Sequence, residues 1–218
     1  MGAKENCPPN DAIAASSLLE FLIGRRSIRR YLELPVAREL VDSLLDAATA
    51  AASAHNRQPW RFLVIEGLPA KQRLADAMAG RLRSDRRGDG DSAEVIEADV
   101  SRSYARLTGA PVLVVVCMTM ADMDRYADDR RNQAERLMAV QGTAMAAQNL
   151  LLAAHAAGLG ACWMCAPLFC ADTVASVLTL PPGWEPQAII TLGYPADRGK
   201  PFRRHPLSEV ARYEDRKP

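Results

Sequence analysis

The chain has 218 residues, 49% of them hydrophobic, and its 27 basic and 26 acidic residues give a formal net charge of +1. This size suffices for one domain with a full core, or for a protomer that shares its core with a partner. The balanced charge argues against a nucleic-acid-binding protein, which usually has a strong basic excess. We expect no apolar run long enough to span a bilayer, and residues 1–10 lack the apolar core of a signal peptide. We therefore expect a cytoplasmic protein that makes no membrane contact.

The first half of the chain alternates helical and extended patterns. A helix capped by Asn10 or Asp11 is expected to run to about Arg25, and helical spacing of apolar residues predicts a second over residues 36–52. Residues 62–65 are predicted as a strand and 69–82 as a helix. The polar residues 81–91, interrupted by Gly88 and Gly90, indicate a mobile surface loop. A helix over 92–107 and a buried, valine-rich strand over 111–117 follow.

The second half is dominated by a long helix predicted over residues 130–157. Residues 137–157 are apolar on nearly all sides, which indicates a central helix, packed at a dimer interface. After a Gly-Leu-Gly stop come strands over 161–164 and 187–192, with a helix over 172–178 between them. The tail, 196–218, has no core pattern and is expected to wrap around a partner subunit. The mixture of elements predicts an α+β protein with one central sheet, a single domain over 1–218 with residues 1–10 flexible.

The five cysteines are Cys7, Cys117, Cys162, Cys165 and Cys170. An odd number of cysteines without a secretion signal favours reduced thiols. The Cys162-x-x-Cys165 spacing is compatible with a redox pair or half a zinc site, but no second pair accompanies it, so core packing is favoured. His55, His155 and His205 are too scattered for a metal triad, and we expect no metal site.

Four arginines fall within six positions, at Arg25, Arg26, Arg29 and Arg30, with Ser27 among them. Guanidinium groups are forked donors that suit phosphate oxygens, and they stay charged at any cellular pH. Burying so many cations is costly unless an anion is present. The segment is therefore a candidate phosphate site, with a solvated basic turn as the alternative.

Two further polar clusters accompany the arginines. Residues 53–60 offer Ser53, His55, Asn56 and Gln58 between a helix end and a strand, and amides can read a heterocycle edge or a polyol chain. An ordinary capped loop is the alternative interpretation. The third cluster, Arg203-Arg204-His205, lies in the tail.

The order of these motifs resembles the nitroreductase family of flavoenzymes. The shared features are Arg-Arg-Ser-x-Arg, Ser-x-x-Asn-x-Gln-Pro-Trp-x-Phe, a long Gln-containing apolar helix, Gly-Leu-Gly, Leu-Gly-Tyr-Pro and a late arginine before Pro-Leu, covering residues 18–210. Within that family, residues 73–78, 148–151, 163–170 and 178–186 look like the C-terminal domain of FbiB, a flavin-dependent reductase in deazaflavin coenzyme biosynthesis.

The resemblance implies a nitroreductase-like fold, with a mostly antiparallel sheet flanked by helices and an intertwined homodimer that binds FMN at its interface. Arg25, Arg26, Ser27 and Arg29 would hold the FMN phosphate and the polar flavin edge, and Arg204, with Arg203 beside it, would close on the phosphate. Ser53, Asn56 and Gln58 would reach the ring and ribityl chain from the partner subunit. The ring would also be contacted by Gln141, Gly160, Met164, Cys165 and Ala166.

The resemblance further implies an oxidoreductase in which NAD(P)H passes a hydride through FMN N5 to a small organic acceptor in a ping-pong cycle. No side chain is expected to act as general acid or base, because the cofactor carries the chemistry. Residues 81–102 are expected to form a mobile cover over the site. Two alternatives stay open: a reductase acting on a dehydro precursor of the deazaflavin coenzyme, and a flavin-binding protein without turnover.

Overall fold

The structure, a computed structural model, describes residues 15–214, and its centre is a four-stranded antiparallel sheet. The strands are β1 (Trp60–Ile65), β2 (Val112–Met118), β3 (Gly160–Met164) and β4 (Glu185–Gly193), in the order β1-β2-β4-β3. All three neighbouring pairs are antiparallel. The predicted α+β architecture with a central antiparallel sheet is thus confirmed.

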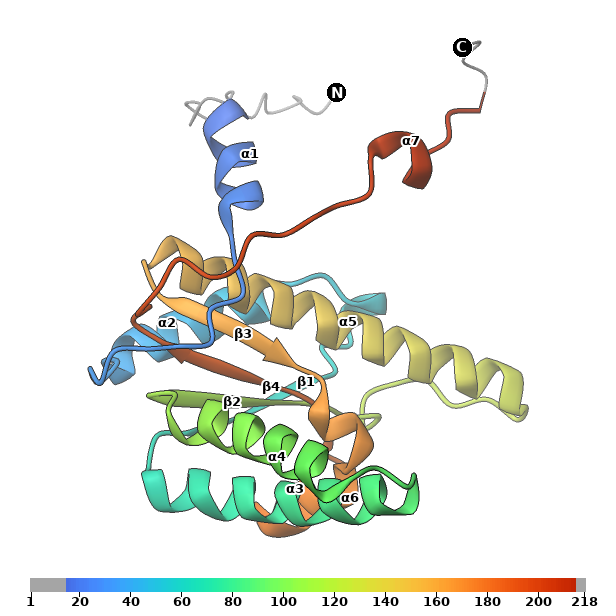
Figure 1. The fold of residues 1–218 in the computed structure, drawn as a ribbon. Helices are drawn as coiled ribbons and strands as arrows, with labels where there is room; N and C mark the ends of the chain where they lie inside the picture. The colour runs from blue at the N-terminus through green and yellow to red at the C-terminus, as the bar shows by residue number, and fades with distance from the viewer. Residues whose placement is uncertain (1–14, 215–218) are drawn as a thin grey trace, which may run out of the picture.

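Helices cover both faces of the sheet (Figure 1). One face carries α2 (Arg38–Thr49) and α5 (Asp129–Ala156), and the other carries α3 (Leu68–Gly88), α4 (Ala93–Thr108) and α6 (Ala171–Val177). The two short 3₁₀ helices η1 (Ala54–Asn56) and η2 (Ala166–Phe169) were not predicted. The terminal helices α1 (Ala15–Gly24) and α7 (Leu207–Val210) project away from the layered body (Figure 1).

Strand β2 shows why the sheet must be covered on both sides. Its side chains alternate between the faces, so Val114 and Val116 join the core under α2 and α5, while Leu113 and Val115 join the core under α3. Every residue of β2 is buried. A continuous apolar strand can be stable only between two helical layers.

Helix α5 corrects one expectation from the sequence. Among the described residues it is the one helix long and apolar enough, by length and composition, to cross a membrane, although we expected no such run. Core helices pass the same test, and Ala147, Leu150 and Ala154 of α5 are buried in the core shared with α2 and the sheet. The helix also has an open face, where Leu137 and Met145 are 57% and 43% exposed.

The predicted loop over residues 81–91 was wrong, because α3 continues to Gly88. The arginines in this stretch hold it helical through ion pairs, within α3 between Arg81 and Asp85 and to α4 between Arg83 and Glu97. Arg86 adds a contact of 2.6 Å to Asp99 of α4. The partners of Arg83 and Arg86 lie 14 and 13 residues further along the chain, so the polarity of the stretch alone did not reveal these pairs.

Helix α7 was not predicted, and the remaining elements lie within a few residues of their predicted bounds. Ser92 caps α4 by accepting a hydrogen bond from the Val95 N–H, as expected for a helix starting there. The predicted cap at Asn10 or Asp11, flexible residues 1–10 and Cys7 lie outside the described residues. Within the described part of the tail, residues 196–214, no residue belongs to the buried core, as its sequence indicated.

Candidate functional site

The arginine-rich segment and the tail together enclose a cavity of about 210 Å³, here called the arginine cavity. Its lining residues are Arg25, Arg26, Ser27, Arg29, Lys200, Pro201, Phe202 and Arg204. The set holds five cationic side chains and no acidic one. Like charges so close together favour an anion, and forked guanidinium donors suit the oxygens of a phosphate group.

The arginine segment is fixed on the edge strand β3. The Ile28 N–H donates to the Ala161 carbonyl at 3.0 Å, and Ile28 itself is buried, 7% exposed. A Cβ added at Gly160 would lie 2.7 Å from Ile28 Cβ, so glycine is required for this close approach. With Ile28 pointing inward, the flanking side chains of Ser27 and Arg29 are left to line the cavity.

Tyr31 secures the end of the same segment. Its hydroxyl donates to the Ile28 carbonyl at 2.6 Å and shares a 2.6 Å hydrogen bond with Thr191 Oγ1 on β4. Burial raises the pKa of Tyr31 well above its usual value, so the hydroxyl stays protonated and these bonds persist over the whole physiological range.

Asp197 ties the tail to the arginine segment. Its carboxylate accepts hydrogen bonds from the Gly199 N–H at 2.8 Å and from Arg30 Nε at 2.9 Å. These contacts, the Gly199 N–H first and then Arg30, lower the pKa of Asp197. Gly199 has a φ of +73°, and a Cβ there would lie 3.1 Å from Arg26 Cβ, so the tail can pass this closely only at a glycine.

Phe202 positions two of the cations of the arginine cavity, Arg26 and Arg204. The guanidinium carbons of Arg26 and Arg204 lie 4.0 Å and 4.2 Å from the centroid of its ring. Cation–π contacts of this kind orient the planes of both guanidinium groups. The structure thus joins Arg204, from the tail, to the Arg-Arg-Ser-x-Arg motif. Arg203, which we predicted beside it, does not line the cavity.

A second cavity of about 750 Å³ adjoins the arginine cavity and shares Ser27, Arg29 and Lys200 with it. Helix α4 adds Arg102, the last residue of the predicted cover, and Arg106, which the sequence analysis missed. Their i, i+4 spacing places both on one helical face, a signal that was readable once α4 was expected to flank the site. Burial raises the pKa of Cys162 on β3, while the positive charges of Arg29 and Arg106 act in the opposite direction.

The predicted amide loop has an unusual backbone. His55, Asn56 and Gln58 have φ values of 49°, 54° and 48°, in the left-handed region that is uncommon for residues other than glycine and least favoured here for Gln58. The Ser53 hydroxyl accepts from the Gln58 N–H at 3.0 Å and closes the loop. Asn56 and Gln58 are exposed. Strain of this kind is concentrated at functional sites, where the surrounding structure enforces it.

Within one chain, the amide loop and the arginine cavity lie apart. The loop packs on α5 at Gly142, where an added Cβ would be 3.3 Å from Ser53 Cβ. The arginine segment packs near His155, whose Nε2 would lie 3.5 Å from a Cβ at Gly24. The 13 residues between Gly142 and His155 correspond to about 20 Å of helix. A single chain therefore does not bring the two predicted halves together.

The other predicted site residues lie on β3 and α5. Gly160 starts β3 beside the arginine cavity, and Met164, Cys165 and Ala166 follow at its far end. Cys165 is exposed. Gln141 lies exposed on α5, on the open side that also presents Met145.

The four described cysteines, Cys117, Cys162, Cys165 and Cys170, form no disulfide. Among residues 15–214, no group of three or more His, Cys, Asp or Glu side chains is arranged to hold a metal ion. The Cys162-x-x-Cys165 pair is divided by burial, because Cys162 lies in the interior and Cys165 is at the surface.

Comparison with known proteins identifies the family. The model of the nitroreductase family matches residues 22–194. A Thermus thermophilus protein named NADH dehydrogenase is 32% identical over 212 residues, covering 86% of this chain and 91% of that protein. A Methanothermobacter thermautotrophicus protein with the name NADH dehydrogenase/NAD(P)H nitroreductase is 30% identical over 191 residues, 85% of this chain and 81% of that protein.

Solved structures of similar proteins support the same family. A Desulfovibrio desulfuricans structure described as a nitroreductase in complex with FMN is 31% identical, with a TM-score of 0.69, and covers 92% of this chain and 98% of that one. A BluB-like flavoprotein from Clostridium difficile shares the fold with a TM-score of 0.75 at 23% identity, covering 91% and 99%. The family model, the relatives and the fold lead to one conclusion: the chain belongs to the nitroreductase family.

Proposed function

We propose that the protein is an FMN-dependent oxidoreductase that takes a hydride from NAD(P)H and passes it to a small organic acceptor. The observation that carries the proposal is the arginine cavity, which five cations line without an acidic residue. The Desulfovibrio desulfuricans relative holds FMN, and the two curated relatives bear names of NAD(P)H-dependent enzymes, which support the same conclusion.

The residues present fit FMN. The phosphate would be held by Arg25, Arg26, Arg29 and Arg204, with the Ser27 hydroxyl as an additional donor. From this cavity, β3 leads to Met164 and the following residues, which would line the ring system. Arg102 and Arg106 line the adjoining cavity, together with Glu33 and Asp197, and would place positive charge near the cofactor.

A second copy of the chain would complete the site. The amide loop of one chain is too far from its own arginine cavity, so Ser53, Asn56 and Gln58 are proposed to reach the cofactor of the partner. Large apolar side chains are also exposed on α1, on α5 and along the tail: Leu18, Leu19, Leu22, Ile23, Leu137, Met145, Phe202, Leu207, Val210 and Tyr213. Exposed apolar surface of this extent marks an interaction surface. We therefore propose a homodimer in which α1 and the tail of one chain lie on the other.

When bound, FMN supplies hydride transfer at N5, in a ping-pong cycle between the nicotinamide and the acceptor. The chain's own residues would bind the cofactor and orient it. The arginine cavity anchors the phosphate, and its cations lower the electrostatic cost of placing negative charge nearby. The amides of Asn56 and Gln58 offer donors to the ring edge.

Residues 81–102 are proposed to border the substrate opening rather than to form a basic lid. Arg81, Arg83 and Arg86 are paired with carboxylates, which reduces their attraction for an anionic acceptor. Arg102 and Arg106 line the adjoining cavity, but Arg102 is paired with Asp99 in the same way. Arg106 is therefore the group that would favour an acidic acceptor such as a deazaflavin precursor. The free thiols of the described cysteines are compatible with a location in the reducing cytoplasm.

Reconstitution tests the proposal. We expect the purified protein to bind FMN, to elute as a dimer, and to lose its yellow colour with NADH or NADPH and regain it with a quinone or nitroarene. Bound FMN that neither nicotinamide reduces would support a flavin-binding role without turnover. Failure to bind FMN at all would refute the assignment of the arginine cavity.

A further inference from the structure

A third cavity lies on the other side of the segment that follows the arginines. Its volume is about 620 Å³, within the range of small-molecule sites. Three segments line it: residues 32–38, residues 66–71 at the start of α3, and residues 108–112 at the start of β2. It shares no residue with the arginine cavity, and it shares Glu33 and Gly109 with the adjoining cavity of about 750 Å³.

The walls of this cavity are aliphatic. They include Leu32, Leu34, Val36, Leu68 and Val112, and no aromatic residue is among the lining side chains. Leu32, Leu34 and Leu68 are 46%, 49% and 49% exposed, although large aliphatic side chains favour burial. A flexible aliphatic body fits such walls better than a flat ring does.

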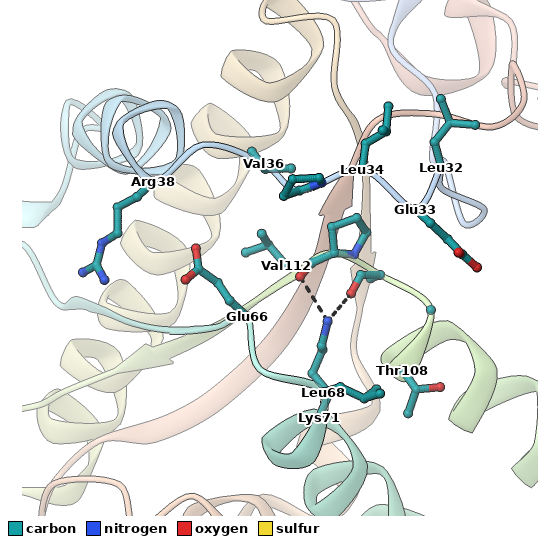
Figure 2. Close-up of a pocket in the computed structure, with 14 residues that line it drawn as sticks. Leu32, Glu33, Leu34, Val36, Arg38, Glu66, Leu68, Lys71, Thr108 and Val112 are labelled. Carbon is teal, nitrogen blue, oxygen red and sulfur yellow. Dashed lines mark hydrogen bonds between the residues drawn. The ribbon is translucent and has the colours of Figure 1, made fainter.

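One charged side chain is buried in this apolar setting. Lys71 is only 5% exposed, and Figure 2 shows it rising from α3 between the 32–36 segment and β2. Its Nζ donates to the carbonyls of Ala110 at 2.7 Å and Pro111 at 3.0 Å. An ammonium group has three donors, so one is left over.

The charge of Lys71 is not neutralised nearby. No carboxylate of the described residues lies within 4.0 Å of its Nζ. Burial lowers the pKa of Lys71, and the charge of Glu66 acts in the opposite direction. Glu33 and Glu66 are exposed at the rim, where solvent screens them, as is Arg38. The buried cation is therefore the group that selects a ligand.

We propose that this cavity binds a small aliphatic monocarboxylate, with its carboxylate on Lys71 Nζ and its chain against Leu32, Leu34 and Leu68. The carboxylate would take up the remaining donor and neutralise a buried charge. The aliphatic chain would cover the exposed leucines. The site is distinct from the arginine cavity, with which it shares no residue, and it selects a different chemical class of ligand.

Isothermal titration calorimetry on the full chain with bound FMN tests the proposal, with octanoate as the probe. Octanol and octylamine, of equal chain length but neutral and cationic, are the comparison ligands. We expect octanoate to bind at least tenfold more tightly than either. Equal binding of octanol and octanoate would overturn the role of Lys71, and no binding of octanoate would overturn the site.

Variants locate the binding. Lys71→Met should weaken octanoate binding at least tenfold, while Arg73→Met, an exposed cation on the same helix, should leave it unchanged. Leu68→Asp places a repelling carboxylate at the rim, at a half-exposed position, and should also abolish binding without disturbing the fold. Wild-type affinity in the Leu68→Asp variant would refute the location even if Lys71→Met failed to fold. FMN content should be the same in all folded variants.

Discussion

Replacement of Arg25 by alanine separates cofactor binding from stability. Its side chain makes no hydrogen bond or ion pair within residues 15–214, although it lines a cavity with four other cations. Its removal therefore leaves no carboxylate unpaired, and the free energy of unfolding of the cofactor-free protein should change by no more than about 0.5 kcal/mol. A charge-assisted hydrogen bond to phosphate is lost, at a cost of about 1.5–3 kcal/mol. That corresponds to roughly ten- to a hundredfold weaker FMN binding.

The assay is a fluorescence titration of the cofactor-free protein with FMN and, separately, with riboflavin. Riboflavin has no phosphate, so Arg25→Ala should weaken FMN binding while leaving riboflavin binding nearly unchanged. Arg73→Ala, an exposed arginine on α3, is the matched control and should alter neither. Ionic strength must be held constant, because salt screens partly exposed charges.

Two results would refute this reasoning. Unchanged FMN affinity in Arg25→Ala would show that Arg25 does not contact the cofactor. An equal loss for FMN and riboflavin would place the contact on the ring or the ribityl chain instead of the phosphate.

Three further substitutions test the construction of the site. Gln58→Gly relieves a left-handed backbone at φ 48° and should stabilise the cofactor-free protein by about 1 kcal/mol in urea denaturation, while FMN titration shows weaker binding because the amide is lost. Gly160→Ala would press a methyl group against Ile28, 2.7 Å away, and should cost about 1–3 kcal/mol of unfolding free energy; no loss would show that the strand edge yields. The pKa of Asp197 is lowered in the folded protein, so the ionised carboxylate stabilises the fold. This stabilisation is complete above the ordinary aspartate pKa of about 4. It is lost as the pH falls through the pKa of Asp197 in the folded state. Asp197→Asn should therefore be less stable than the wild type at pH 7, and urea midpoints of the two proteins should converge on acidification; a constant difference would contradict the assigned hydrogen bonds.

The sequence itself determined the order and type of most elements. Apolar periodicity predicted α2, and a long stretch apolar on nearly all sides predicted α5. An apolar, valine-rich run predicted β2 as a strand buried on both faces. The arginine motif indicated an anion site, because residue type and close spacing carry the relevant chemistry. These features are local, so a single chain segment contains all the information needed to recognise them.

The tertiary structure decided which distant groups meet. Only the fold shows that contacts of Asp197 and Phe202 bring Arg204 back to the arginine motif. It also places Arg102 and Arg106 beside the adjoining cavity. The ion pairs that hold residues 81–88 helical likewise appear only in the folded chain. Only the fold encloses Lys71 within an aliphatic cavity. The physical reason is that burial and charge pairing depend on neighbours in space, and these neighbours come from segments separated by many residues whose approach no local pattern encodes.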